Sequence, residues 1–256
     1  MSDVQFHTMP DGTKIAFRCV AGSGPLLVFL PGYMSDMDGG KATALFGWAK
    51  ARGQAALLLD YSGCGRSDED FADGSLSTWR DEVLALIEAT GGEHHVVLVG
   101  SSMGGWLMLM LGEALGDRLT GVLGIAAAPD FTDWGYDDAQ KAALSEGETV
   151  FEENPYGPDP TPTYAKFWAD GEANRMLART IEITAPVRLL HGQRDADVPW
   201  EISQKLAAAL RSDDVQTIFI KDGDHRLSRD QDIAVLINTA AQLMATIEHP
   251  TNEQSC

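Results

Sequence analysis

The sequence predicts an α/β fold in which a mostly parallel sheet of about eight strands carries helices on both faces. Short apolar runs such as Pro25–Leu30 and Val96–Val99 contain no polar residue, which is typical of strands buried on both faces. These runs alternate with segments of helical spacing along most of the chain, as in parallel sheets covered by helices. With 256 residues, 44% of them hydrophobic, the chain is predicted to form a single domain over 1–256.

The elements follow from these patterns in chain order. An opening hairpin is predicted from Val4–Thr8 and Lys14–Val20, joined through Pro10-Asp11-Gly12. The strands predicted after it cover Pro25–Leu30, Ala55–Asp60, His94–Val99, Leu119–Ala128, Val187–His191 and Val215–Ile220. The predicted helices cover Lys41–Arg52, Thr78–Thr90 with Ser77 or Thr78 as the N-cap, a segment from Trp106 to about Leu115, Glu201–Leu210 and Asp230–Ile247.

One segment departs from the alternation. The stretch from about Phe131 to Ile183 is polar, carries four prolines and is interleaved with aromatic residues. It lies between the sixth and seventh predicted strands, and we predict that it forms a short helical cap over the functional face of the sheet. The alternative is a long surface excursion with a small core of its own and no contact with substrate.

The composition excludes several classes of function. A net charge of -19 and a pI near 4.5 leave no basic stripe for nucleic acid, and they disfavour anionic membranes. No apolar run approaches membrane-spanning length. The cysteines, Cys19, Cys64 and Cys256, are widely spaced and odd in number, which favours reduced thiols, and the N-terminus has no signal or transit pattern. We therefore expect a cytoplasmic protein; the oligomeric state is not readable from the sequence.

The most informative motif is Gly100-Ser101-Ser102-Met103-Gly104. It reads G-x-S-x-G, directly after the apolar run Val96–Val99 and directly before the apolar helical run Trp106–Leu111. A strand, a sharp turn and a helix form the context of a nucleophile elbow, in which the middle serine projects from the turn. Glycines flank the serine because side chains would collide there. We predict that Ser102 is a catalytic nucleophile.

A serine nucleophile needs a base, and the chain offers six histidines. His225 lies in a loop after the last predicted strand, where the chain order Ser…Asp…His places the base. The other histidines are less suitable, because His7 and His249 lie near the termini and His94 and His95 lie at the start of a strand. His191 ends a strand in a His-Gly turn, where a structural hydrogen bond is the better interpretation.

The acid that orients the base should follow the penultimate strand. Asp195 fits the pattern H-G-x-x-D-x-x-V-P that runs from His191 to Pro199, and we prefer it. Asp197 competes by proximity, although it could instead cap the helix that begins near Pro199. Asp130 is a third candidate, since it ends the strand after the elbow helix. Whichever serves, it holds the imidazole tautomer and stabilises the imidazolium.

The oxyanion of an acyl-transfer intermediate is stabilised by backbone N–H groups. Met103, directly after the nucleophile, should supply one, and Tyr33, in the loop Pro31-Gly32-Tyr33 after the third predicted strand, should supply the other. The side chains of Met34, Trp106 and Trp200 are predicted to border the substrate. Neither the Gly63-Cys64-Gly65 segment nor Asp38–Lys41 has a nucleotide-binding form, and His191, Asp195 and Asp197 lack a second histidine cluster for a metal. We expect no cofactor and no metal.

Several segments resemble a known family. They are Leu30–Met37, Asp60-Tyr61-Ser62-Gly63, Gly100–Met108, Arg188–Gly192, Val198-Pro199-Trp200 and Asp224-His225-Arg226. In these segments the chain is similar to the α/β-hydrolase-domain depalmitoylases of mitochondria, also known as mycophenolic acid acyl-glucuronide esterases. The resemblance implies the α/β-hydrolase fold, a triad of Ser102, Asp195 and His225, and hydrolysis of acyl thioesters and activated esters. The N-terminus shows no mitochondrial presequence, which favours a bacterial-type cytosolic relative.

Together these features predict a cofactor-free serine hydrolase of carboxylic esters or thioesters that works through an acyl-enzyme. Its expected partner is a small-molecule acyl ester or thioester. An acyltransferase or a C–C bond hydrolase could use the same triad. An epoxide hydrolase or dehalogenase would need aspartate at the elbow, where this chain has Ser102. A non-catalytic ligand receptor on the same fold is the alternative from another class.

Overall fold

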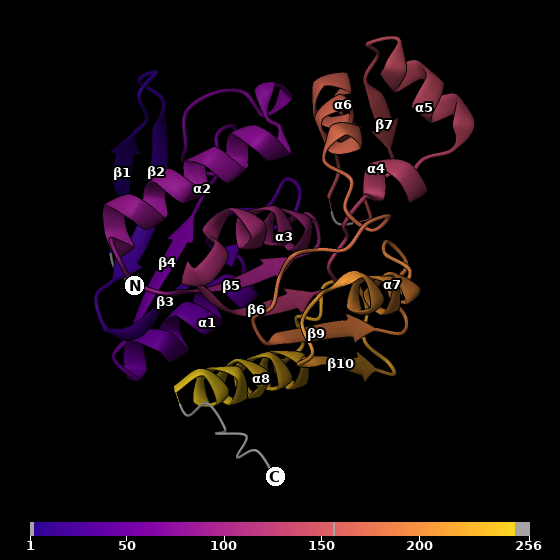
Figure 1. Ribbon diagram of the computed structural model, residues 1–256. Helices are drawn as coiled ribbons and strands as arrows, with labels where there is room; N and C mark the ends of the chain where they lie inside the picture. The colour runs from indigo at the N-terminus through magenta and orange to yellow at the C-terminus, as the bar shows by residue number, and fades with distance from the viewer. Residues whose placement is uncertain (1–2, 156, 249–256) are drawn as a thin grey trace.

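A computed structural model describes residues 3–155 and 157–248, so His249 and Cys256 lie outside the described residues. Its main sheet has eight strands in the order β1-β2-β4-β3-β5-β6-β9-β10 (Figure 1). The strands are β1 Gln5–Thr8, β2 Lys14–Val20, β3 Ser23–Leu30, β4 Gln54–Leu59, β5 Val96–Ser101, β6 Leu119–Ile125, β9 Val187–Gly192 and β10 Val215–Ile220. The helices that cover the sheet are α1 Gly40–Ala51, α2 Leu76–Gly91, α3 Met103–Leu115, α7 Glu201–Ala209 and α8 Asp230–Glu248.

The strand pairing confirms the predicted fold class. In the main sheet the antiparallel pairings are at the opening hairpin: β1 pairs with β2, and β2 also pairs with β4 in antiparallel register. From β4 to β10 every pairing within the main sheet is parallel. Strand β5 lies between β3 and β6, with Gly100 opposite both Leu30 and Gly124. The carboxyl end of β5, where the serine motif begins, is therefore at the centre of the sheet.

The sheet separates two hydrophobic cores, one on each face. Helices α2 and α3 cover one face, and α1 and α8 cover the other (Figure 1). Trp79 of α2 and Leu107 of α3 are fully buried in the first core, and Phe46 of α1 and Leu243 of α8 in the second. Burial of a side chain of this size contributes about 1.5–3 kcal/mol of favourable transfer free energy. None of the described helices is both long enough and apolar enough to cross a membrane.

Several predicted boundaries were shifted, since β5 covers Val96–Ser101 and not residues 94–99, and α3 begins at Met103 and not at residue 106. Two further shifts have a clear local reason. Helix α2 begins earlier than expected, and its N-cap is Ser75, whose hydroxyl accepts from the Thr78 N–H at 3.2 Å. Ser77 instead donates from its N–H and its hydroxyl to the Asp170 carboxylate. Strand β6 ends at Ile125, not at residue 128, because Ala126 adopts a positive φ of 45°.

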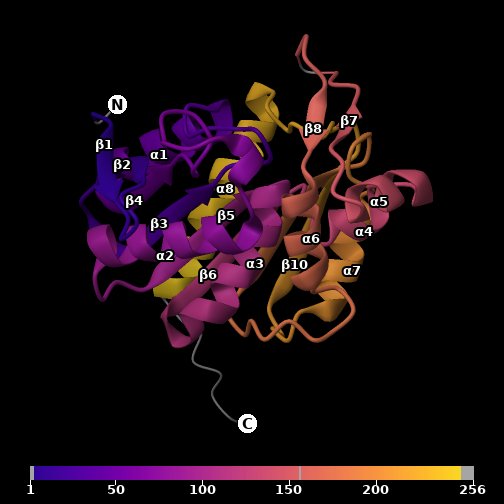
Figure 2. The same ribbon diagram turned by 90° about the horizontal axis from the view of Figure 1, so that it is seen from above.

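The segment from 131 to 183 holds more than the predicted helices. A two-stranded antiparallel hairpin, β7 and β8, stands between its second and third helices and projects from the molecule (Figure 2). This hairpin was missed because each strand has only three residues and the connection is rich in proline. The elements are α4 Phe131–Trp134, α5 Asp138–Ser145, β7 Val150–Glu152, β8 Thr161–Thr163 and α6 Ala165–Ala173. That the chain is one domain with this segment as its cap stays a prediction.

Polar anchors hold the segment against the rest of the fold. The Asp170 carboxylate accepts from Ser77 at the start of α2, and the Trp106 indole N–H of α3 donates to the carbonyl of Asn174 at 3.1 Å. The Tyr33 hydroxyl donates to the carbonyl of Pro162 at 3.0 Å. Around Tyr33 the rings of Phe71, Phe131 and Phe167 pack within 4.9 to 6.1 Å of its centroid. The segment is therefore fixed at several points rather than attached at its two ends alone.

The first prediction concerns glycine spacing. A Cβ at Gly104 would lie 2.2 Å from the carbonyl oxygen of Leu30, whereas one at Gly47 of α1 would meet no atom within 4 Å. We expect Gly104→Ala to lower the free energy of unfolding by about 2 kcal/mol or more, because backbone has to move. Gly47→Ala should raise it by about 0.5–1 kcal/mol, since alanine favours a helix interior. Urea unfolding followed by circular dichroism measures both; equal effects of the two substitutions would contradict the packing argument.

Candidate active site

Ser102 lies in the strained turn between β5 and α3. Its backbone has φ 55° and ψ -120°, a conformation that residues with side chains rarely adopt. The turn is held from both sides, because the Ser102 N–H donates to the Ile125 carbonyl at 2.9 Å and the Ser102 carbonyl accepts from the Ala128 N–H at 3.0 Å. A Cβ at Gly100 would lie 2.3 Å from the Gly104 carbonyl oxygen, which explains the first glycine of the motif.

The structure brings Ser102, His225 and Asp195 into one hydrogen-bonded line. The Nε2 atom of His225 lies 3.1 Å from Oγ of Ser102, and its Nδ1 atom lies 2.8 Å from Oδ2 of Asp195. His225 comes from the loop between β10 and α8, and Asp195 from the loop after β9. These loops adjoin because β9 and β10 are parallel neighbours, and their carboxyl ends meet at one edge. The arrangement can deprotonate the hydroxyl and orient the imidazole that does so.

Asp195 is fully buried at its side chain and is held as a carboxylate. Burial raises the pKa of this carboxyl, but hydrogen bonds from His191 and His225, the charge of His225 and the Val198 N–H outweigh it. The net result is a pKa well below the ordinary value. Its Oδ1 atom accepts from the N–H groups of Asp197 and Val198 at 2.9 and 2.8 Å. Asp195 thus carries a fixed negative charge toward His225.

His191 has the structural role that its position suggested. It is fully buried, its Nδ1 lies 2.7 Å from the Ser203 hydroxyl, and its Nε2 lies 3.1 Å from the Val198 carbonyl. The same Nε2 is 3.2 Å from Oδ2 of Asp195. Since both neighbours of Nε2 are acceptors, we assign the proton of a neutral His191 to Nε2. The buried His191 therefore fixes the loop that carries Asp195 through its contacts with Val198 and Asp195.

The two other candidate acids have different surroundings. The Asp130 carboxylate is buried and accepts from the N–H groups of Met176 and Leu177, both at 2.8 Å, so it ties down the end of the segment after α6. Burial raises the pKa of Asp130 above its usual value despite these bonds. Asp197 is exposed, and its carboxylate, the Asp195 carboxylate and a ring nitrogen of His225 lie within 4.8 Å of one another. The N-cap of α7 is Trp200, not Asp197.

Tyr33 and Met103, the predicted oxyanion donors, both border the same cavity as Ser102. Gly32, just before Tyr33, is packed against the elbow, since a Cβ there would lie 3.3 Å from Cβ of Ser102. Met103 is the first residue of α3, where backbone N–H groups have no partner within the helix. These positions suit two N–H donors aimed at one oxygen, although their role stays a prediction.

A residue without an assigned role, Asp60, supports the loop that carries Tyr33. Its fully buried carboxylate accepts from the Met37 N–H at 2.7 Å and from the Arg66 N–H at 2.9 Å. Desolvation by burial raises the pKa of this carboxyl, against the lowering effect of those two bonds. The sequence signal was its place at the end of a buried strand, directly before a glycine-rich loop. Asp60 therefore links the loop after β4 to the loop after β3.

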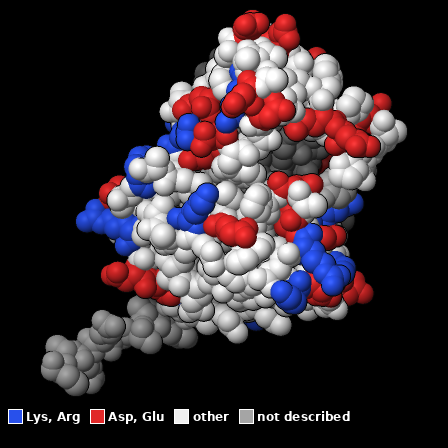
Figure 3. Space-filling model, turned by 90° about the vertical axis from the view of Figure 1, so that its right-hand side faces the viewer, with Lys and Arg blue, Asp and Glu red and all other residues white. Residues whose placement is uncertain are grey.

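The cavity at Ser102 has a volume of about 770 Å³. Met34 lines it as predicted, whereas Trp106 and Trp200 lie outside the described lining. Trp106 is fully buried beneath the segment from 131 to 183, and Trp200 packs edge-on against Phe219 at 5.1 Å. Figure 3 shows this face hollowed, with acidic side chains around the hollow. The Phe, Tyr and Trp residues of the lining are Phe29, Tyr33, Phe131, Trp134 and Tyr136, and the acidic residues are Asp36, Glu152, Glu153 and Asp197.

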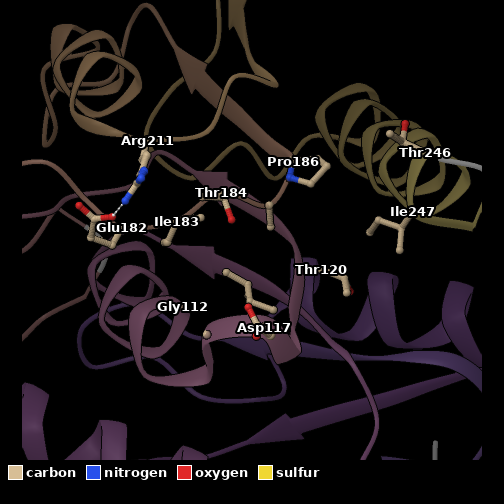
Figure 4. A pocket seen from close by; sticks show the side chains of 13 residues that line it. Gly112, Asp117, Thr120, Glu182, Ile183, Thr184, Pro186, Arg211, Thr246 and Ile247 are labelled. Atoms are coloured by element: carbon tan, nitrogen blue, oxygen red, sulfur yellow. Dashed lines mark hydrogen bonds and ion pairs between the residues drawn. The ribbon is translucent and has the colours of Figure 1, made fainter. Parts of the chain in front are cut away.

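A second cavity of about 580 Å³ lies at the opposite end of the strands, near the amino ends of β6 and β9 (Figure 4). The Glu182–Arg211 ion pair borders it, together with Thr184, Thr246 and Ile247. None of the three residues of the hydrogen-bonded line is among its described lining. We therefore take the cavity at Ser102, and not this second cavity, as the candidate active site.

Comparison with known proteins agrees with the fold. The model of the alpha/beta hydrolase family matches residues 27–238. The palmitoyl-protein thioesterase ABHD10, mitochondrial, of Mus musculus is 37% identical over 249 residues, which cover 95% of this chain and 83% of that protein. The solved structure of mouse alpha/beta hydrolase domain-containing protein 10 gives a TM-score of 0.88 at 33% identity, covering 96% of this chain and 100% of the other. A putative hydrolase from Agrobacterium vitis S4 gives 0.87 at 36% identity, covering 94% and 99%. The predicted resemblance is confirmed.

The second prediction separates the three aspartates. We expect Asp195→Asn to lower kcat by about 10³- to 10⁴-fold while leaving the melting temperature within a few degrees, because the amide cannot stabilise the imidazolium. Asp130→Asn should instead lower the melting temperature, since an amide NH₂ would face a backbone N–H of residue 176 or 177. Asp197→Asn should affect both quantities least.

Steady-state kinetics and thermal melting of the three variants test this assignment. A loss of kcat in Asp130→Asn that exceeds the loss in Asp195→Asn, with the fold intact, would move the acid to the end of β6.

Proposed function

The chain belongs to the alpha/beta hydrolase family, and we propose that it is a serine hydrolase that cleaves carboxylic esters and thioesters through an acyl-enzyme. One observation carries the proposal: Oγ of Ser102 lies 3.1 Å from Nε2 of His225, whose Nδ1 lies 2.8 Å from Oδ2 of Asp195. A hydroxyl, an imidazole and a carboxylate in this order form the triad by which serine hydrolases activate serine for acyl transfer.

Acylation begins when Ser102 attacks the carbonyl carbon of the substrate and His225 accepts the hydroxyl proton at Nε2. The carbonyl oxygen becomes negatively charged and accepts from the N–H groups of Tyr33 and Met103. His225 then gives its proton to the departing alcohol or thiol, which leaves the acyl group on Ser102. Water, deprotonated by His225, then attacks the acyl carbon. The bond between this carbon and Oγ of Ser102 breaks, His225 returns the proton to Oγ, and the carboxylic acid is released. Asp195 remains ionised throughout, in keeping with its lowered pKa.

The cavity supports an acyl group of short or medium length. Its walls include apolar side chains such as Phe131 and Trp134, which favour an aliphatic chain. Other lining residues, Glu152 of β7 and Glu153 just after it, carry carboxylates. Methylene groups that reach carboxylates gain nothing from burial, so the apolar part of the pocket ends there. The relative from mouse is named a palmitoyl-protein thioesterase, which supports thioesters as one substrate class.

The third prediction is that Ser102 and His225 act as one unit. We expect Ser102→Ala and His225→Ala each to lower kcat on p-nitrophenyl butyrate by about 10³-fold or more. The double variant should lose little further activity, because His225 has no hydroxyl to deprotonate once Ser102 is replaced. Multiplicative losses, or a Ser102→Ala enzyme that keeps most of its activity, would exclude the proposed mechanism. Product analysis distinguishes hydrolysis from acyl transfer and from C–C bond cleavage.

The fourth prediction concerns acyl length. Across p-nitrophenyl esters and acyl thioesters, each methylene that fits should raise kcat/KM by up to about fourfold, equivalent to about 0.8 kcal/mol. The gain should stop at medium length, and amides should react poorly because their leaving group needs stronger protonation. Glu152→Leu should extend the gain to longer chains, with Glu146→Leu, exposed after α5, as the matched control. A kcat/KM that does not change with acyl length would contradict an apolar pocket for the acyl chain.

A further inference from the structure

The loop that carries His225 is held against the loop after β9. Its Gly223 carbonyl accepts from the Arg194 N–H at 2.9 Å, and Gly223 packs so tightly on Gly192 that a Cβ there would lie 2.3 Å from the same carbonyl oxygen. Leu227 is buried in the core at a positive φ of 43°, and its N–H donates to Asp224 at 3.0 Å. Between these fixed points, His225 and Arg226 extend along the cavity.

A second contact to this loop comes from helix α1. Lys41, in the first turn of α1, lines the cavity and donates from Nζ to the backbone carbonyl of Arg226, the residue after His225. Helix α1 lies next to α8 on the lower face of the sheet, and the loop that carries His225 leads into α8 (Figure 1). The imidazole therefore stands in a loop held at one end by the sheet and in its middle by Lys41.

The place of Lys41 is unfavourable for helix α1 itself. A positive charge in the first turn of a helix opposes the helix macrodipole, and acidic residues are favoured there. This first turn contains no acidic residue, and its N-cap is Gly39, which has no side chain to offer. Burial lowers the pKa of Lys41 to about 8, aided by the charge of Arg226 and opposed by Asp224, Asp195 and Asp232. A cation that is costly both to the helix and to desolvation indicates a role outside the helix.

We propose that Lys41 is a positioning residue for the reaction: by holding the Arg226 carbonyl, it fixes the loop that aims the imidazole of His225 at Ser102. The proposal rests on the serine hydrolase function proposed above. Lys41 need not touch the reacting atoms, because displacement of a base by about 1 Å can cost up to 100-fold in rate. Lys41 forms only a small part of the cavity wall, and the aromatic walls come from other residues, so the effect should fall mainly on kcat and much less on KM.

The test compares Lys41→Met, Lys41→Arg and a control, Lys50→Met, in the exposed last turn of the same helix. In hydrolysis of p-nitrophenyl butyrate, we expect Lys41→Met to lower kcat about tenfold or more with KM changed less than about twofold. It should also slow the labelling of Ser102 by a fluorophosphonate probe by a similar factor. Lys41→Arg should restore most of both rates, because a guanidinium also donates to a carbonyl. Lys50→Met should match the wild type.

The outcomes separate the two proposals. If the wild type is not labelled at Ser102, the serine hydrolase proposal fails and the role of Lys41 fails with it. If the wild type is labelled and Lys41→Met equals it in labelling and kcat, only the role of Lys41 is overturned. A loss that appears in KM alone, or that Lys41→Arg does not restore, also overturns it. Thermal melting shows that each variant is folded at the assay temperature.

Discussion

The site depends on one constraint, the close packing of the turn at Ser102 between its neighbouring strands. Ser102 can hold its positive φ because Ile125 and Ala128 bind its backbone and because glycines remove the side chains that would separate β5 from α3 and from the loop after β3. The strain is concentrated in a residue whose side chain then stands free of the sheet. The same packing brings the loop of Tyr33 beside Ser102. One local arrangement therefore places both the proposed nucleophile and the groups proposed to stabilise the oxyanion.

The remaining members of the site come from the loops after β9 and β10, the last two strands of the chain, at one side of the sheet. Parallel pairing of β9 with β10 brings the loops of Asp195 and His225 together, and the buried His191 supports the carboxylate from within. Four donors, two backbone N–H groups and two imidazoles, offset the free-energy cost of burying the Asp195 carboxylate. The orientation of the carboxylate is thus independent of substrate. A base oriented in advance loses little free energy to reorganisation when the reaction begins.

Sequence reasoning found the parts of the site that are written locally. The elbow at Ser102, the strand runs and the order of Asp195 and His225 are recognisable because each depends on residues close in the chain. Trp106 illustrates what cannot be found in this way, since its proximity to the motif suggested a pocket residue, whereas its indole anchors the segment at Asn174. Asp130 and Lys41 were obscure for the same reason: their partners lie 46 and 185 residues away. Such long-range contacts depend on the whole fold, which no local pattern encodes.

The segment from 131 to 183 and the site are mechanically connected through the end of β6. Ala128 binds the Ser102 carbonyl, and Asp130, two residues on, binds the N–H groups of Met176 and Leu177. A displacement of the segment would therefore pull on the strand end that stabilises the strained turn. At its other side Tyr33 joins the loop beside the elbow to Pro162. Both connections lead to parts of the chain that border the cavity, so the walls of the cavity and the turn that carries Ser102 hold each other in place. Variation of the hairpin β7–β8 outside its anchor at Pro162 can change the depth of the pocket while the geometry of the turn at Ser102 remains intact.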